Sequence, residues 1–288
     1  MRKIPIALIY VFLYSLFWAI NIIISRFVLK AGFNPLILTL EQNFFAALFL
    51  SFFLFFQFKT LTKTSKTSLL GAMFIGCFGS GFAVLLSQYG LSLSTSINYS
   101  FLIMTSTVFT VIIAKFLLKE AISGLKLIFL SLMMLGAFLL STKGQMIIPN
   151  KGDIYILIAA VFFGVTANIS RLIIKKDIQP NLVSFFRVFS AWITISLIYF
   201  ISGHTFKSLT ITFPVILIGF FQAVLLFFLN QAFKVASASY VTMISMITPV
   251  LVALMAYPLL GEKLIFIQII GALAIIVGGV LTQIKKAA

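Results

Sequence analysis

The chain contains little charge, few acids and almost none of the side chains that most enzymes use for chemistry. Charged residues make up 9% of the 288 positions, and only five of them are acidic. A soluble domain carries roughly 25% charged residues. There is one cysteine, Cys77, and one histidine, His204. A disulfide framework is therefore excluded, and metal hydrolysis or a nucleophilic triad lacks its parts.

Apolar residues are what the chain has in abundance, at 62% of the sequence and a mean hydropathy of +1.20. Runs of about 20 apolar residues predict membrane spans, and only a helix satisfies its backbone within one such run. We therefore expect an all-α integral membrane protein with ten transmembrane helices. The predicted spans are Ile6–Val28, Pro35–Phe56, Ser68–Leu86, Ile97–Phe116, Gly124–Leu140, Asp153–Ile174, Pro180–Ile201, Ile211–Phe233, Ala238–Leu259 and Leu264–Leu281.

The net charge of +16 comes from basic residues that are scattered through short loops. That distribution fits membrane topology better than a nucleic-acid surface, so no nucleic-acid partner is expected. Thirteen Lys and Arg residues fall in loops on the N-terminal side of the predicted membrane and six fall on the other side. We expect the protein in the plasma (inner) membrane of the cell. The positive-inside rule then predicts that both termini lie in the cytoplasm. The Ser141–Gly152 loop is expected outside.

The two halves of the sequence repeat each other. Phe17–Pro35 and Phe162–Pro180, 145 positions apart, are identical at six of nineteen positions. At a shift of 142, Leu117–Glu120 superposes on Leu259–Glu262. Each copy holds five predicted spans, and an odd number means that the second copy crosses the membrane in the opposite sense. We expect inverted repeats over residues 1–145 and 146–288, as in alternating-access transporters.

Short motifs carry a resemblance to a known family. Trp18-Ala19-Ile20-Asn21 resembles a Trp-Gly-x-Asn stretch, and Phe185-Phe186-Arg187 resembles a Phe-Arg at a helix start. Ala236–Ser239, Ile247–Val250 and Leu260–Lys263 follow in the same order. Together the chain resembles the EamA-type branch of the drug/metabolite transporter superfamily. The first half departs from the pattern, with Thr107 where the second has Pro249, Lys119 where it has Gly261 and Gln42 where it has Arg187.

The resemblance implies secondary transport of small polar or amphiphilic metabolites such as amino acids, by alternating access through a central cavity between the repeats. Export is the direction that it favours, and import or facilitated transport by the same fold is the alternative. A polytopic membrane enzyme or a channel is a less favoured alternative, because the sequence shows neither catalytic clusters nor a filter-like loop. The expected partners are a small-molecule substrate and the lipid bilayer, for a monomer or weak dimer. No cofactor and no metal are expected.

Polar side chains at helical spacing within the spans identify the candidate cavity. Polar groups in hydrocarbon are costly, so such faces should look inward, although helix packing explains some of them equally well. The first, third, fourth, sixth, eighth and ninth spans are expected to line the cavity, with the other four more peripheral. The candidate residues are Tyr14, Trp18, Asn21, Tyr99, Ser106, Thr110, Phe163, Thr166, Gln222, Thr242, Ser245 and Thr248. The fourth and ninth spans are also expected to be weak or broken helices, the ninth because Pro249 removes a backbone donor.

Few charges fall inside the spans. Glu41 and Arg26 are expected to pair across the first hairpin, and the alternative is that Glu41 carries a coupling proton. Arg187 is expected to extend to the cytoplasmic interface, and the alternative is contact with a substrate carboxylate. Glu120 and Glu262 each precede a span, where a carboxylate suits the positive end of the helix.

Glycines of the third span form another pattern. Gly71, Gly76, Gly79 and Gly81 recur within 11 residues of that span. Small residues let the backbones of neighbouring helices approach closely. The pattern therefore predicts a close-packing face.

Overall fold

The computed structural model describes residues 3–56, 64–142, 150–205, 211–260 and 265–284, and in these ranges the chain is helical without strands. Nine helical segments there are long and apolar enough to cross a membrane, and a tenth apolar helix covers Phe266–Thr282. The ten predicted spans are therefore present. The helices of the first half are α1 (Lys3–Lys30), α2 (Pro35–Phe56), α4 (Lys66–Phe74), η1 (Ile75–Ala83), α5 (Val84–Leu93), α6 (Ser96–Met104), α7 (Ser106–Leu117) and α8 (Gly124–Thr142). Those of the second half are α9 (Lys151–Lys176), α10 (Pro180–Ile201), α11 (Phe213–Val235), α12 (Ala238–Ser245), α13 (Thr248–Leu260) and α14 (Phe266–Ile284).

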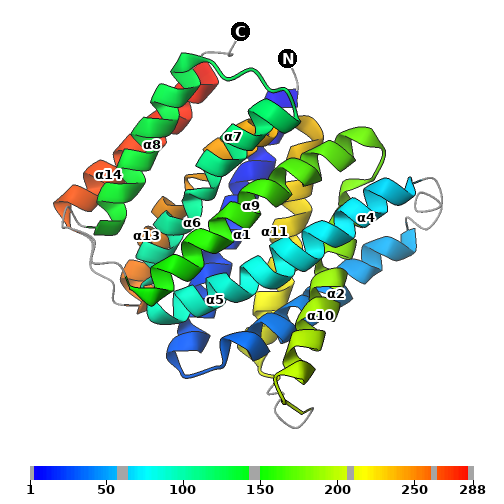
Figure 1. Cartoon of the computed structure of the whole chain (residues 1–288). Coiled ribbons are helices and arrows are strands. Elements are labelled where there is room, and N and C mark those ends of the chain that lie inside the picture. The colour runs from blue at the N-terminus through cyan, green and yellow to red at the C-terminus, as the bar shows by residue number, and fades with distance from the viewer. Residues whose placement is uncertain (1–2, 57–63, 143–149, 206–210, 261–264, 285–288) are drawn as a thin grey trace.

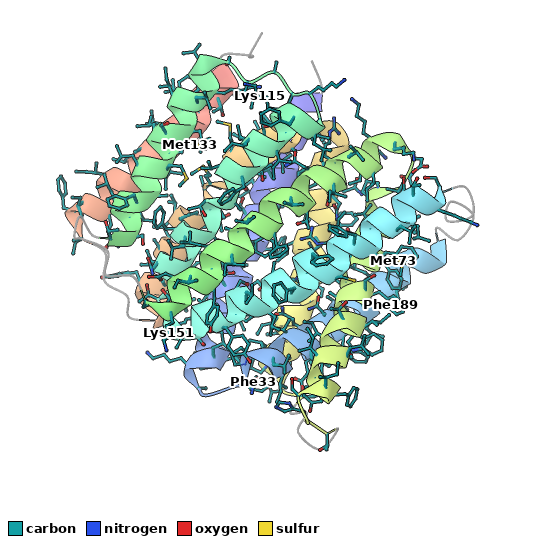
Figure 2. All side chains as sticks on the ribbon, viewed as in Figure 1. Phe33, Met73, Lys115, Met133, Lys151 and Phe189 are labelled. Atoms are coloured by element: carbon teal, nitrogen blue, oxygen red, sulfur yellow. The ribbon has the colours of Figure 1, made fainter. Side chains whose placement is uncertain are left out.

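The two ends of the chain lie at the same end of the helix bundle, as an even number of crossings requires (Figure 1). We call this the terminal end and the other the distal end. Lys115, near the end of α7, and Lys151, at the start of α9, lie at opposite ends (Figure 2). Large apolar side chains such as Phe52, Phe116 and Leu197 are exposed on the outside of the bundle. In a bilayer these side chains face lipid.

Helices of one half pack mainly against helices of the other. The most extensive pairs are α1 with α11, α8 with α14 and α2 with α10. The last two pairs join equivalent spans of the two repeats, as a two-fold axis in the membrane plane demands. The α8–α14 pair stands apart from the remaining helices in Figure 1. It is held by glycine contacts, because a Cβ on Gly136 would lie 2.6 Å from the carbonyl oxygen of Gly271.

The fourth and ninth spans are broken helices, as predicted. The fourth changes from α6 to α7 at Thr105, and the ninth from α12 to α13 after Ser245. Tight turns replace the regular helical bonds there, with Thr105 N–H donating to Leu102 O (3.1 Å) and Met246 N–H to Met243 O (3.2 Å). The break in the first half forms without a proline.

The third span is longer and less regular than predicted. It runs from Lys66 to Leu93, seven residues beyond the expected end at Leu86. The extension is helical because its polar Gln88 turns inward, where its amide donates to Gln42 Oε1 (3.1 Å). The middle of the span is a π-helix, η1, which the sequence analysis did not predict.

Close packing at glycines accounts for the position of η1. A Cβ on Gly76 would lie 2.4 Å from the backbone oxygen of Arg187, and one on Gly79 would lie 3.0 Å from the Thr166 side chain. The glycine face of the third span is therefore a packing face, as predicted. It brings the η1 backbone against α9 and α10, and π-helical turns of this kind are frequent at functional sites.

Candidate functional site

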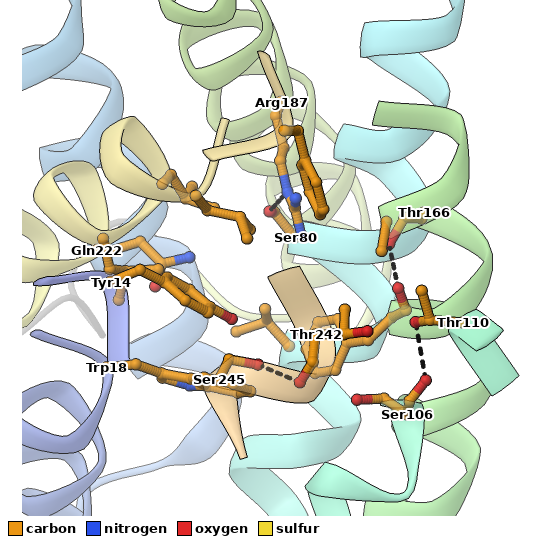
Figure 3. Close-up of a pocket in the computed structure, with 17 residues that line it drawn as sticks. Tyr14, Trp18, Ser80, Ser106, Thr110, Thr166, Arg187, Gln222, Thr242 and Ser245 are labelled. Carbon is orange, nitrogen blue, oxygen red and sulfur yellow. Dashed lines mark hydrogen bonds between the residues drawn. The ribbon is translucent and has the colours of Figure 1, made fainter. Parts of the chain in front are cut away.

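A polar cavity of about 80 Å³ lies between the two repeats, and we call it the large cavity because it is the larger of two neighbouring polar cavities. A wholly apolar groove of about 500 Å³, lined by residues such as Phe12, Met133 and Ile276, is larger still. Helices of both halves contribute to it: α1, η1, α5 and α7 from the first and α9, α10, α11 and α12 from the second. Figure 3 shows the labelled side chains around this space. The polar and aromatic lining residues are Tyr14, Trp18, Ser80, Ser106, Thr110, Phe163, Thr166, Arg187, Gln222, Phe233, Thr242 and Ser245.

A second and smaller cavity of about 30 Å³, which we call the small cavity, lies on the distal side of the first. Its lining includes Asn21, Ser87, Gln88 and Tyr99. Four side chains line both cavities and form the wall between them: Trp18, Val84, Phe163 and Gln222. Only these four shared side chains separate the two cavities.

The structure brings eleven of the twelve candidate residues to these two cavities. Tyr14, Ser106, Thr110, Thr166, Thr242 and Ser245 line the large cavity, Asn21 and Tyr99 line the small one, and Trp18, Phe163 and Gln222 line both. Thr248 lines neither. It is fully buried, and its hydroxyl donates to Ser245 O (2.7 Å) in the turn between α12 and α13.

Most hydroxyls around the large cavity donate within their own helix. Thr110 donates to Ser106 O (2.8 Å), Ser245 to Thr242 O (2.8 Å) and Thr166 to Phe163 O (3.3 Å). This back-bonding satisfies the hydroxyl hydrogen at low cost. The oxygen lone pairs remain available, so this side of the cavity presents hydrogen-bond acceptors.

The second and seventh spans take part in the site, and the prediction that both are peripheral was wrong. Arg187 of α10 lines the large cavity and Gln42 of α2 lines the small one. These two residues are equivalent under the 145-residue repeat. The inverted repeat therefore supplies each cavity with one polar residue from the α2–α10 pair.

Arg187 does not extend to the membrane interface, so that prediction was also wrong. It is 5% exposed, and its Nε donates to Ser80 Oγ (2.6 Å) in η1. Glycine packing keeps η1 close to α10, which puts Ser80 within reach of the guanidinium. Ser80 is the functional candidate that the sequence analysis missed, and the flanking glycines Gly79 and Gly81 were the available signal. For Arg187, the alternative of contact with a substrate carboxylate stays a prediction.

Arg26 and Glu41 lie outside the lining of both cavities. Arg26 Nη1 donates to the carbonyl oxygens of Leu91 (2.9 Å) and Ser92 (3.1 Å), at the C-terminal end of α5. A cation is favourable at that end of a helix. Glu41 is buried within α2. Their expected pairing remains a prediction.

Glu120 binds a helix start, but not that of the span that follows it. Its carboxylate accepts the Ala238 N–H (2.9 Å), the Ser239 N–H (3.2 Å) and the Ser239 hydroxyl (2.6 Å). The acid therefore stabilises the N-terminus of α12 in the opposite repeat, so the prediction was right about the interaction and wrong about the helix. Glu262 lies outside the described residues.

Searches for similar proteins identify a family and a fold. The family model described as "EamA-like transporter family" matches the chain twice, over residues 5–142 and 150–283. Among solved structures, 29 chains match. One of them, described only as a crystal structure of a protein, has a TM-score of 0.76 and 14% identity, with 98% of both chains covered. This likeness shows the fold alone. No curated protein matches the sequence.

Proposed function

The chain belongs to the EamA-like transporter family, and from this membership we propose that it exports small amphiphilic metabolites such as amino acids by alternating access. Membership makes the protein a membrane transporter of the drug/metabolite type. The proposal adds the substrate class, the direction and the route. The observation that carries it is the pair of cavities between the repeats, separated by the wall of Trp18, Val84, Phe163 and Gln222.

The residues that line the large cavity support an amphiphilic substrate. The large cavity combines aromatic and aliphatic walls, such as Trp18, Phe163 and Leu226, with one guanidinium and several hydroxyls. A site of this composition suits a small molecule with an apolar body and a few polar groups. Amino acids with apolar side chains have that character.

The position of the large cavity supports export. Its lining includes Leu229 and Phe233 near the end of α11, together with Thr242 in α12. These residues lie toward the terminal end. From the loop charges, we expect that end to be on the cytoplasmic side of the plasma (inner) membrane. A site with more space toward the cytoplasm is suited to loading from that side. The expected partner remains the lipid bilayer, for a monomer or weak dimer.

Transport into proteoliposomes tests this proposal. We expect saturable counterflow of at least one apolar L-amino acid in a panel, measured with an imposed pH gradient and without one. Substrate-dependent counterflow distinguishes a carrier from a channel, whose flux is not accelerated by substrate on the opposite side. If the protein transports other metabolites but none of the amino acids in the panel, the proposed substrate class is contradicted. Accumulation in intact cells would contradict export and favour an importer.

A further inference from the structure

Arg187 is a buried cation with free hydrogen-bonding capacity. A guanidinium has five N–H donors. In the part of the chain that the structure describes, its one hydrogen bond is Nε to Ser80 Oγ. The Nη groups face the large cavity, where Figure 3 shows Arg187 and Tyr14 approaching the same space from different helices. Tyr14 is close enough to interact electrostatically with Arg187, and no hydrogen bond joins its hydroxyl to the other lining residues drawn in Figure 3.

None of the four described acids shares this cavity with Arg187. Glu120 binds the start of α12, and Asp153 forms a capping box with Asn150 at the start of α9. Asp177 is exposed beyond the end of α9. Glu41 lies on α2 and is not a lining residue. A buried charge is costly unless it is paired or hydrogen-bonded, so an anion inside the cavity would stabilise Arg187 where none of the described acids does.

The number of donors indicates which anion this is. Among the residues that the structure describes, Arg187 is the one basic side chain that lines the large cavity, with the Tyr14 hydroxyl as a neutral second donor. One guanidinium matches one carboxylate through two parallel hydrogen bonds. A phosphate dianion would leave charge uncompensated here. The neighbouring Trp18 and Phe163 add an apolar wall, and Trp18 stacks on Tyr14 with ring centroids 5.3 Å apart.

We propose that Arg187 and Tyr14 form a carboxylate subsite in the large cavity, oriented by Ser80, and that the substrate is an organic monocarboxylate with an apolar body. This inference rests on the proposed transport function and adds the group by which the substrate is recognised. Ser80 is a positioning residue, because it holds Nε and so aims the two Nη groups. The wall of Trp18 and Phe163 receives the apolar part of the substrate.

Matched ligand pairs test the subsite on the purified full-length protein without requiring transport. The probes are L-leucine, L-phenylalanine and 3-phenylpropionate, each with its carboxamide, and the readout is ligand-induced stabilisation against thermal unfolding. We expect wild type to respond to at least one acid and not to its amide. In Arg187→Gln the affinity for that acid should fall about ten- to a hundredfold, the value of a lost hydrogen bond to a charged group. Binding of the amide should not change.

Variants around the site separate binding from structure. Ser80→Ala and Tyr14→Phe should reduce the ratio of acid to amide affinity partially. Arg171→Gln is the matched control, because it removes another intramembrane guanidinium, which donates to Phe233 O and does not line the cavity. Its ratio should equal that of wild type. If Arg187→Gln does not fold, Arg187→Lys replaces it, and a lower ratio is expected because an ammonium lacks the planar pair of donors.

The outcomes distinguish this inference from the transport proposal. An unchanged ratio in Arg187→Gln or Arg187→Lys overturns the subsite, even if the protein transports amino acids. A wild-type response to the amides alone also overturns it. Arg187-dependent binding of an acid that is not transported supports the subsite and contradicts the transport proposal.

Discussion

The position of one charge in the membrane depends on a residue that has no side chain. Gly76 lies against the backbone of α10, and this contact sets the distance between Ser80 and Arg187. A methyl group at Gly76 would lie 2.4 Å from the Arg187 carbonyl oxygen and 2.7 Å from Ser190 Cβ. Real Cβ atoms do not approach backbone atoms so closely, so α10 or η1 would have to move.

Gly76→Ala should therefore destabilise the protein by about 1–3 kcal/mol, as overpacking does. Thermal unfolding in detergent measures this, and substrate counterflow should fall in parallel because Arg187 is displaced. Gly124→Ala is the control, since no atom lies within 4 Å of the added Cβ. It should stay within about 0.5 kcal/mol of wild type. Equal behaviour of the two variants would show that the close contact has no structural role.

Polar and aromatic residues that repeat along a helix face, such as Tyr14, Trp18 and Asn21, can be found from the sequence, and the structure places them at the two cavities. The sequence did not predict the direction of an isolated charge. Arg187 occupies a position from which a long side chain can reach either the interface or the interior. The choice depends on η1, and a π-helix has no hydrophobic period of its own that a sequence reveals.

At the scale of the helical elements, the breaks in the fourth and ninth spans occupy equivalent positions of the repeat. Thr105 and Ile247 are 142 residues apart, and each lies in the tight turn between two helical pieces. Only the second break has a proline, Pro249. The turn therefore follows from packing between the halves, in which Thr107 Oγ1 donates to Thr242 O (3.2 Å), as well as from sequence.

Pro249→Ala should consequently keep the break. Proline restricts the backbone of the unfolded chain, and alanine buries fewer atoms than proline. We therefore expect the free energy of unfolding to fall by about 1 kcal/mol. The counterflow rate should remain close to that of wild type, since the first half works without a proline at the equivalent Thr107. Thermal unfolding and counterflow on the same preparation measure both. Loss of transport in a stable variant would show that the proline itself is required.

A second element-scale interaction depends on pH. Asp177, between α9 and α10, accepts the Ser65 N–H (3.1 Å) at the start of α4. Hydrogen bonds from the hydroxyls of Ser65 and then Ser68 lower the pKa of Asp177 below its usual 3.8. A lowered pKa means that the contribution to stability is present above the unfolded value and is lost as the pH falls through the folded value.

Asp177→Asn should therefore unfold at a lower temperature than wild type near neutral pH, by a small amount because the carboxylate is exposed. The difference should shrink as the pH falls below 3.8 and through the lowered pKa of the folded state, where wild type also loses the charge. Parallel melting curves from neutral to acidic pH measure it. A difference that is constant with pH would exclude the carboxylate charge as its cause.

At the scale of the whole molecule, the apolar runs and the repeat predicted the helical two-repeat architecture because both are properties of the entire chain. The remaining test is the orientation in the membrane, which the charge bias predicts. Ser65 lies at the terminal end and Ser141 at the distal end, so single cysteines there, in a background without Cys77, should label oppositely. An impermeant maleimide applied to intact cells should modify Ser141→Cys and not Ser65→Cys. Equal labelling would contradict the inverted topology.

Polar contacts join the two repeats at both ends of the molecule. At the terminal end, Glu120 accepts three hydrogen bonds from Ala238 and Ser239. At the distal end, Asn98 donates to Asp153 Oδ1 (3.0 Å) and accepts from the Ser141 hydroxyl (2.7 Å). In the alternating access that we propose, rocking of one repeat against the other has to break these contacts in turn. Each contact then disfavours the state that is open at its own end of the molecule.

Glu120→Gln should then shift the population toward states open at the terminal end, and Asn98→Ala toward states open at the distal end. A reporter cysteine at Leu229, which lines the large cavity near the terminal end, measures this by its labelling rate in inside-out vesicles. A capping interaction of about 0.5–2 kcal/mol corresponds to a change of roughly two- to thirtyfold in that equilibrium. The rate should rise in Glu120→Gln and fall in Asn98→Ala. Changes of the same sign in both variants would mean that the contacts stabilise the fold in general and do not balance two states, because only a two-state element responds in opposite directions.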